Sequence, residues 1–100
     1  MGQKKHFDVF TDQTADGSSA QINIAGYQKN LTFSVKTAGS PSFTLTLEAK
    51  DSEGAWIPIH SAAVSTAQEI IEYKDPVFSI FRATISSYAT GTIDIDAHAI

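Results

Sequence analysis

The sequence predicts an all-β domain, a single antiparallel β-sandwich of about seven to eight short strands. Apolar and polar residues alternate in many short segments, turn residues separate these segments at intervals of about 10 to 12 residues, and no segment has a helical period. Charged residues make up only 18% of the chain, and Ser and Thr take their place, which favours strands over exposed helices. A small β-barrel is the alternative that the same pattern allows.

The clearest element is a β-hairpin over residues 42–60, SFTLTLEAKDSEGAWIPIH. Apolar residues occupy every second position of its first half, so one face of that strand is apolar and the other polar. Residues 51–54 supply the turn, because Asp51 can bond its own backbone and Gly54 can adopt a positive φ. In the second half Ile57 and Ile59 are expected to face the core, with Trp56, Pro58 and His60 on the opposite face.

The remaining segments are assigned in chain order by the same alternation. Further strands are expected over residues 6–11, 20–25, 29–37, 69–73, 77–86 and 92–100. Residues 12–19 are expected to form an exposed loop, 38–41 and 87–91 to form turns, and 61–68 remain unassigned. The turn at 38–41 implies that strands 29–37 and 42–49 are antiparallel neighbours. The expected core comprises Ile22, Ile24, Leu31, Phe33, Val35, Phe43, Leu45, Leu47, Ile57, Ile59, Phe81, Ile85, Ile93 and Ile95.

Length and composition limit the function. The 100 residues suffice for one domain, in which we interpret residues 1–6 as a flexible N-terminal arm. The net charge of −4 argues against nucleic acid as a partner, and no segment is apolar enough to span a membrane. The start of the chain has no apolar run typical of a signal peptide, and the absence of cysteine excludes disulfides and thiolate chemistry.

No catalytic motif is recognisable, so the chain is not expected to be an enzyme or to need a cofactor. The three histidines, His6, His60 and His98, lie far apart in sequence and are interpreted as surface residues. Asp94, Asp96 and His98 share one face of the last strand, about 7 Å apart, where neighbours could share a cation. We prefer to interpret this face as the solvent side of a strand, and assign no metal site.

Aromatic residues are the remaining candidates for binding. Trp56 is expected outside the core, and Tyr27, Tyr73 and Tyr88 each lie next to a turn. Exposed aromatic side chains near loops could stack on sugar rings or anchor a protein partner, because they combine a large contact area with a polar group.

Two segments, residues 47–59 (LEAKDSEGAWIPI) and 81–95 (FRATISSYATGTIDI), carry a resemblance to a known group. An acidic turn with Gly, a Trp before an apolar strand, and a late Arg-Ala, Tyr and Thr-Gly-Thr resemble small β-sandwich virion proteins of tailed bacteriophages and prophages, of the capsid decoration or cement type. The late positions are Phe81, Arg82, Ala83, Tyr88, Thr90, Gly91 and Thr92.

The resemblance implies a structural protein of the virion that binds and stabilises the head shell. Its partners would be the major capsid protein or other virion proteins, it would form a homo-oligomer, and it would be made in the cytoplasm of the host bacterium. Residues 1–10 would form an arm, and the expected partner contacts are Lys4, Lys5, Phe7, Phe10, Trp56 and Tyr88. The alternatives are a head–tail connector or tail component, and a carbohydrate-binding module that uses exposed aromatic residues.

Overall fold

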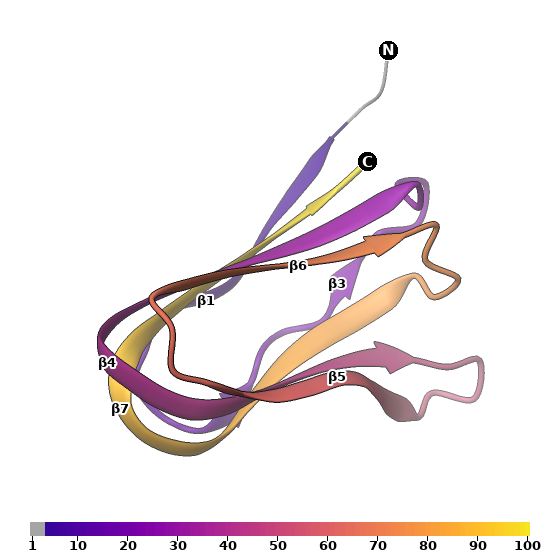
Figure 1. Cartoon of the computed structure of the whole chain (residues 1–100). Helices are drawn as coiled ribbons and strands as arrows, with labels where there is room; N and C mark the ends of the chain where they lie inside the picture. The colour runs from indigo at the N-terminus through magenta and orange to yellow at the C-terminus, as the bar shows by residue number, and fades with distance from the viewer. Residues whose placement is uncertain (1–3) are drawn as a thin grey trace.

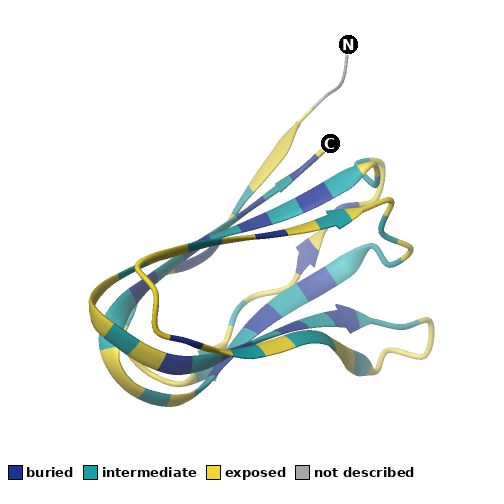
Figure 2. Cartoon of the chain, in the orientation of Figure 1, coloured by how far each residue is buried: buried dark blue, intermediate teal, exposed yellow. Residues whose placement is uncertain are grey.

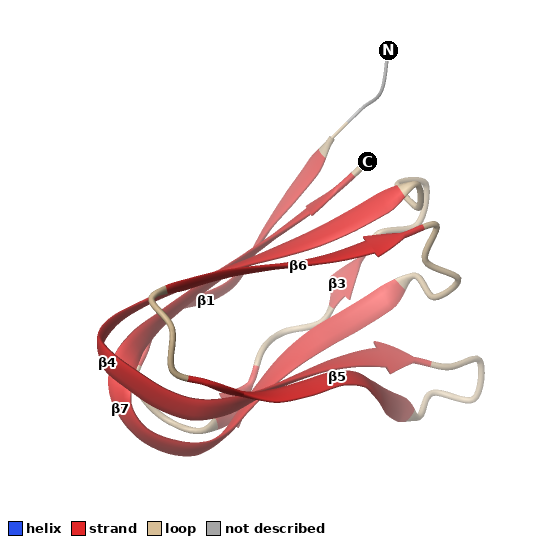
Figure 3. Cartoon of the chain, viewed as in Figure 1, coloured by secondary structure: helices blue, strands red, loops and turns tan. Residues whose placement is uncertain are grey.

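The computed structural model describes residues 4–100, in which all regular structure is β-strand (Figure 3). The strands are β1 (Lys5–Gln13), β2 (Gly17–Ser18), β3 (Ile22–Asn23), β4 (Asn30–Lys50), β5 (Trp56–Val64), β6 (Gln68–Lys74) and β7 (Ile80–Ala99). They form one antiparallel sheet that is not closed into a barrel, so the all-β prediction is confirmed and the barrel alternative is wrong. No helix in this part of the chain is long and apolar enough to cross a membrane.

The two longest strands, β4 and β7, build both layers of the fold. Each is bent in the middle, so that the sheet folds over on itself (Figure 1). The first layer contains residues 30–38 of β4 and 92–99 of β7, flanked by β1 and β6. The second layer contains residues 42–50 and 80–86 of the same two strands, flanked by β5 on one side and by β2 and β3 on the other.

The bends replace two of the turns predicted from the sequence. From the pair Ala38–Thr92 to the next pair, Ser42–Thr90, the chain moves four residues along β4 but only two along β7, so β4 has extra residues there. The reverse occurs between Ser42–Thr90 and Thr44–Ser86. Extra residues bend a strand without ending its pairing, and Gly39 and Gly91 adopt φ values of 75° and 109° there. The prediction that strands 29–37 and 42–49 are hydrogen-bonded neighbours was therefore wrong, since the two halves of β4 lie in different layers.

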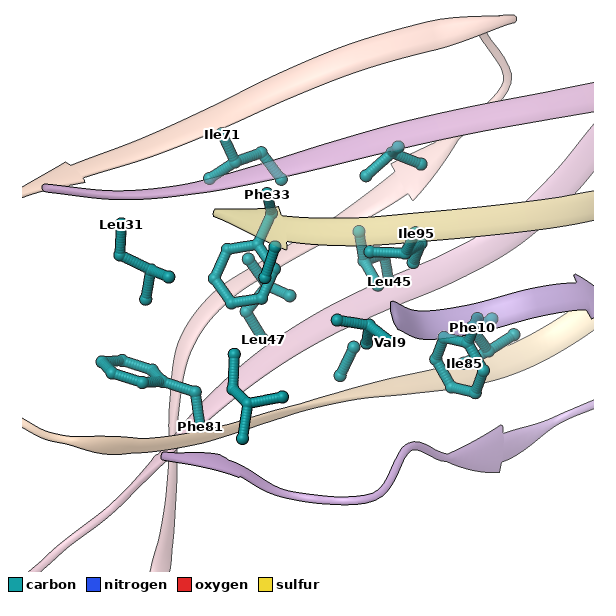
Figure 4. Packing of buried hydrophobic residues seen from close by; sticks show 14 of the residues in the cluster. Val9, Phe10, Leu31, Phe33, Leu45, Leu47, Ile71, Phe81, Ile85 and Ile95 are labelled. Atoms are coloured by element: carbon teal, nitrogen blue, oxygen red, sulfur yellow. The ribbon is translucent and has the colours of Figure 1, made fainter. Parts of the chain in front are cut away.

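The core lies between the two layers (Figures 2 and 4). Alternate residues of β4 and β7 point into it, as the period of two requires. All the expected core residues are buried except Ile57, which is 39% exposed, and Ile59, which is partly buried. Both lie on the edge strand β5, where a register shift opposite Leu47 and Glu48 interrupts the alternation. The structure adds eight residues to the core: Val9, Phe10, Ala49, Val64, Ile71, Ala83, Ala97 and Ala99.

The hairpin over residues 42–60 is confirmed. β4 and β5 pair from Phe43–Val64 to Lys50–Trp56, and the Asp51 carboxylate accepts hydrogen bonds from the backbone N–H groups of Glu53 and Ala55 at 2.9 and 2.8 Å. Elsewhere the expected boundaries change. The strand expected over 20–25 shrinks to β3, and the polar run 12–19 contains the end of β1 and all of β2. Of the unassigned 61–68, residues 61–64 belong to β5 and residue 68 begins β6.

Candidate binding surface

Trp56 begins β5, directly opposite Lys50 at the end of β4. Its indole ring is partly buried beneath two cations: the guanidinium carbon of Arg82 lies 4.4 Å from the ring centroid and the Lys50 Nζ lies 5.5 Å from it. The expectation that Trp56 lies outside the core fits this position. The cations cover part of the ring and hold it in place through cation–π attraction.

Arg82 is held over Trp56 by Glu48, its neighbour on β4. The Arg82 Nε donates to the Glu48 Oε1 at 2.9 Å, and the Thr84 hydroxyl donates to the same oxygen at 2.6 Å. Burial would raise the pKa of Glu48, but the hydrogen bonds from Arg82 and Thr84 and the charge of Arg82 outweigh it, and the pKa is lowered. Glu48 is therefore ionised at neutral pH and fixes the Arg82 side chain.

An open hollow of about 390 Å³ lies beside this cluster, between the β4–β5 turn and the loop before β7. Its lining residues are Lys50, Asp51, Ser52, Val77, Phe78, Ser79 and Ile80. Val77 is 86% exposed, the most of any large hydrophobic side chain in residues 4–100. Lys50 belongs to both the hollow and the Trp56 cluster, so the two form one continuous area, which we call the hairpin-end surface.

The sequence did not identify Val77 as a surface residue, because residues 77–86 were assigned to one strand. In the structure β7 begins at Ile80 and Val77 belongs to the loop before it. Pro76 was the available signal, since proline and its neighbours favour a loop over a strand interior.

The expected contacts near the N-terminus are not brought together as an arm. β1 pairs with β7 from Lys5 onward, Phe10 is only 8% exposed, and Phe7 packs against the core. The arm predicted for residues 1–10 is thus wrong from residue 5, because β1 buries apolar side chains. Residues 1–3 of the expected arm lie outside the described residues. Lys4 is exposed just before β1, and the Lys5 Nζ lies 5.9 Å from the centroid of the Phe7 ring.

Tyr88 has a structural position at the bend of β7. Its hydroxyl donates to the Gly91 carbonyl, and its backbone N–H donates to the Asp16 carboxylate at 2.8 Å. Both bonds stabilise the bent segment beside Ser42–Thr44, whereas Trp56 pairs with Lys50 at the opposite end of the second layer, so Tyr88 does not belong to the hairpin-end surface.

The histidines are arranged differently from the expectation of three surface residues. The bulge in β5 places His60 opposite the buried Leu47, and its Nε2 atom is buried. His6 pairs directly with His98 across β1 and β7, with ring centroids 4.8 Å apart. Asp96 lies beside them, whereas Asp94 instead accepts a hydrogen bond from the Asp12 backbone N–H at 3.0 Å.

No protein family model matches the chain, and no curated protein sequence matches it. Solved structures do share its fold. The SPBc2 prophage-derived protein YomS is 14% identical, with a TM-score of 0.73 over 97% of this chain and 92% of that one. The PBSX exported protein XepA is 16% identical, with a TM-score of 0.76 over 97% of this chain. This chain spans only 37% of the length of XepA.

A mutant of a family 29 carbohydrate-binding module is also similar, with 10% identity and a TM-score of 0.51 over 97% of this chain. At these identities the similarities establish a shared fold. Two of the structures that share it come from prophages, the source that the sequence resemblance implied.

Proposed function

We propose that this chain is a structural protein of a phage virion, and within the virion a decoration or cement protein that binds and stabilises the head shell. The observation that carries the proposal is the fold shared with YomS along nearly the whole length of both chains. A common fold alone does not fix a role. The sequence resemblance to phage virion proteins, found independently in residues 47–59 and 81–95, supports the same source.

The hairpin-end surface is the area that we propose contacts the shell. It combines an exposed aliphatic side chain, Val77, with a tryptophan and the cations of Lys50 and Arg82. Tryptophan and arginine are enriched at the energetic centres of protein interfaces. The neighbouring hollow could accept a side chain from the partner, because it is open to solvent and lined by apolar and polar groups.

A cosedimentation experiment tests this proposal. Empty shells assembled from the major capsid protein of the source phage are mixed with the purified chain and pelleted. We expect the chain to pellet with shells at a fixed ratio, and light scattering of the free chain should give the mass of a homo-oligomer. A chain that stays in the supernatant at saturating shell concentration would contradict the decoration role and favour the connector or tail alternative.

Two matched variants locate the contact. Val77→Asp places a charge in the hairpin-end surface, and Ile70→Asp places the same charge on β6 in the first layer, where Ile70 is 58% exposed. Both positions are exposed, so neither change should unfold the domain. Val77→Asp should weaken shell binding at least tenfold and Ile70→Asp should not. Equal effects of the two variants would contradict the assignment of this surface.

Carbohydrate binding is the second candidate, favoured by the similarity to the family 29 module. Sugar stacking needs a free aromatic face, and the Arg82 guanidinium already lies 4.4 Å from the centroid of the Trp56 ring. We therefore rank it below the virion role. A glycan array tests it: a bound glycan whose affinity falls on Trp56→Ala would favour the module, and binding unaffected by Trp56→Ala would contradict it.

A further inference from the structure

We propose that His6, Asp96 and His98 form a binding site for a divalent transition-metal ion, with Zn²⁺ as the best-fitting ion, on the outer face of the first layer. The site is independent of the hairpin-end surface, which belongs to the second layer. One ligand comes from β1 and two from β7, so the bound ion would join the two strands.

The pairing of β1 with β7 creates the cluster. His6 lies opposite His98 and Asp8 lies opposite Asp96, so a His-x-Asp segment faces an Asp-x-His segment in the antiparallel ladder. Residues two apart on a strand share a face, and directly paired residues lie side by side on it. All four side chains therefore occupy the same face, opposite to the buried Ala97.

The ligand atoms of the three residues lie close enough together to bind one metal ion after small side-chain movements. One donor atom from each of His6, Asp96 and His98 lies within 4.8 Å of the other two. Tetrahedral Zn²⁺ with bonds of about 2.0 to 2.1 Å needs donors about 3.3 Å apart, so small side-chain rotations suffice. The His6 and Asp96 side chains are 49% and 39% exposed, which leaves them free to rotate.

The donor set selects the class of ion. Two imidazole nitrogens with one carboxylate suit Zn²⁺, Ni²⁺ or Cu²⁺, whereas Ca²⁺ and Mg²⁺ prefer oxygen ligands throughout. The Asp8 carboxylate lies 3.7 Å from the His6 Nε2 but is not one of the three residues whose donor atoms all lie within 4.8 Å of one another, so a water molecule would complete the coordination unless the Asp8 side chain rotates inward. Tetrahedral coordination by two nitrogen and two oxygen atoms is a common arrangement for zinc.

The polar groups of the cluster are not committed to other partners. The His6 Nε2 lies 3.7 and 3.8 Å from the Asp8 and Asp96 carboxylates, beyond hydrogen-bond length. In residues 4–100, the only ion pair formed by a lysine or arginine is that of Arg82 with Glu48, so the carboxylates of Asp8 and Asp96 have no such cation at pairing distance. A divalent cation would neutralise these carboxylates and give each imidazole a defined ligand role.

A bound ion would fasten the edge strand β1 to the centre of the first layer. It would connect residue 6 to residue 98 and close almost the whole described chain into one loop. Closing long loops removes the most conformational freedom from the unfolded chain, so stabilisation should be large relative to the single contact formed.

Titration calorimetry and thermal unfolding of the tag-free full chain test the site, with ZnCl₂ as the probe. We expect one Zn²⁺ per chain, and a rise in Tm of about 10 to 20 °C when the free Zn²⁺ concentration is about a hundred times Kd. CaCl₂ should leave Tm unchanged. Absence of both Zn²⁺ binding heat and a Tm shift would overturn the proposal.

Variants assign the ligands. His6→Ala and His98→Ala should each weaken Zn²⁺ binding at least tenfold. Asp94→Asn is the matched control, because Asp94 lies on the same strand but outside the cluster and asparagine keeps an oxygen that can accept from Asp12. Unchanged Zn²⁺ affinity in both histidine variants would overturn the proposal. Circular dichroism checks that each variant is folded. If His98→Ala does not fold, the Zn²⁺ affinity of His6→Ala, which lies on the exposed edge strand, tests the proposal alone.

Discussion

Gly91 is the position where a single methyl group should damage this fold most. A Cβ added there would lie 2.8 Å from the Cα and 3.1 Å from the Cβ of Pro41, and 3.2 Å from the carbonyl oxygen of Ala38. Two of these three atoms belong to the backbone of β4, which cannot rotate away. The φ of Gly91 is also 109°, where residues with a Cβ are strained.

The cost of Gly91→Ala follows from two terms. Forcing an alanine into a positive φ costs about 1 to 2 kcal/mol, and overpacking against a well-packed neighbour costs about 1 to 3 kcal/mol more. Alanine also lowers the conformational entropy of the unfolded chain, which stabilises the folded state by about 0.4 to 1 kcal/mol and offsets part of this loss. We expect a net loss of about 1 to 5 kcal/mol in the free energy of unfolding, a large part of the stability of a domain this size.

Urea unfolding followed by circular dichroism measures this loss, with Gly26→Ala as the control. Gly26 also has a positive φ, 89°, but nothing lies within 4 Å of an added Cβ. It should lose only about 1 kcal/mol, the strain term less the entropy gain. Equal losses for the two variants would refute the claim that β4 and β7 approach each other too closely at the bend for a side chain.

Three further predictions concern the core, the Arg82 pair and the hairpin. Phe33 is fully buried between the layers, so Phe33→Ala should cost about 3 to 5 kcal/mol in thermal unfolding, and a loss below 1 kcal/mol would contradict its central position. The lowered pKa of Glu48 stabilises the fold above the carboxyl's ordinary value of 4.5, and this stability is lost as pH falls through the folded pKa. The stability advantage of the wild type over Glu48→Gln should therefore shrink as the pH falls below 4.5, and an advantage that stays constant on acidification would contradict the assignment. Asp51→Ala removes the acceptor for two turn N–H groups, and should lower the free energy of unfolding by about 1 kcal/mol, whereas Asp51→Asn should retain most of it.

Period-two alternation predicted the strand segments and most of the core, because each layer buries one face of every central strand. It failed at Ile57, since an edge strand has a neighbour on one side only and its bulge shifts the faces. Gly39 and Gly91 were interpreted as turn residues. A positive φ serves a tight turn and a bend in a long strand equally, and the distinction depends on pairing between strands far apart in the chain.

In the candidate sites, too, the sequence predicted which residues share a face of one strand but not which residues meet across neighbouring strands. The periodicity of the last strand placed Asp96 and His98 on one face, and this was correct. It could not find His6, because the contact between positions 6 and 98 depends on which strand lies beside β7. Trp56 was recognised from its position after the turn, but Arg82, which covers its ring, comes from a different strand.

The bent strand β7 also determines when this domain can form during synthesis. Within the domain it is the last strand to leave the ribosome, yet it pairs with β4 in both layers and with β1, β2 and β3 at their edges. Until it emerges, β4 has only β5 and β6 as partners, and the apolar faces of both layers remain open to solvent. The nascent chain should therefore depend on chaperones or rapid completion until its final segment arrives, and should then fold in one concerted step.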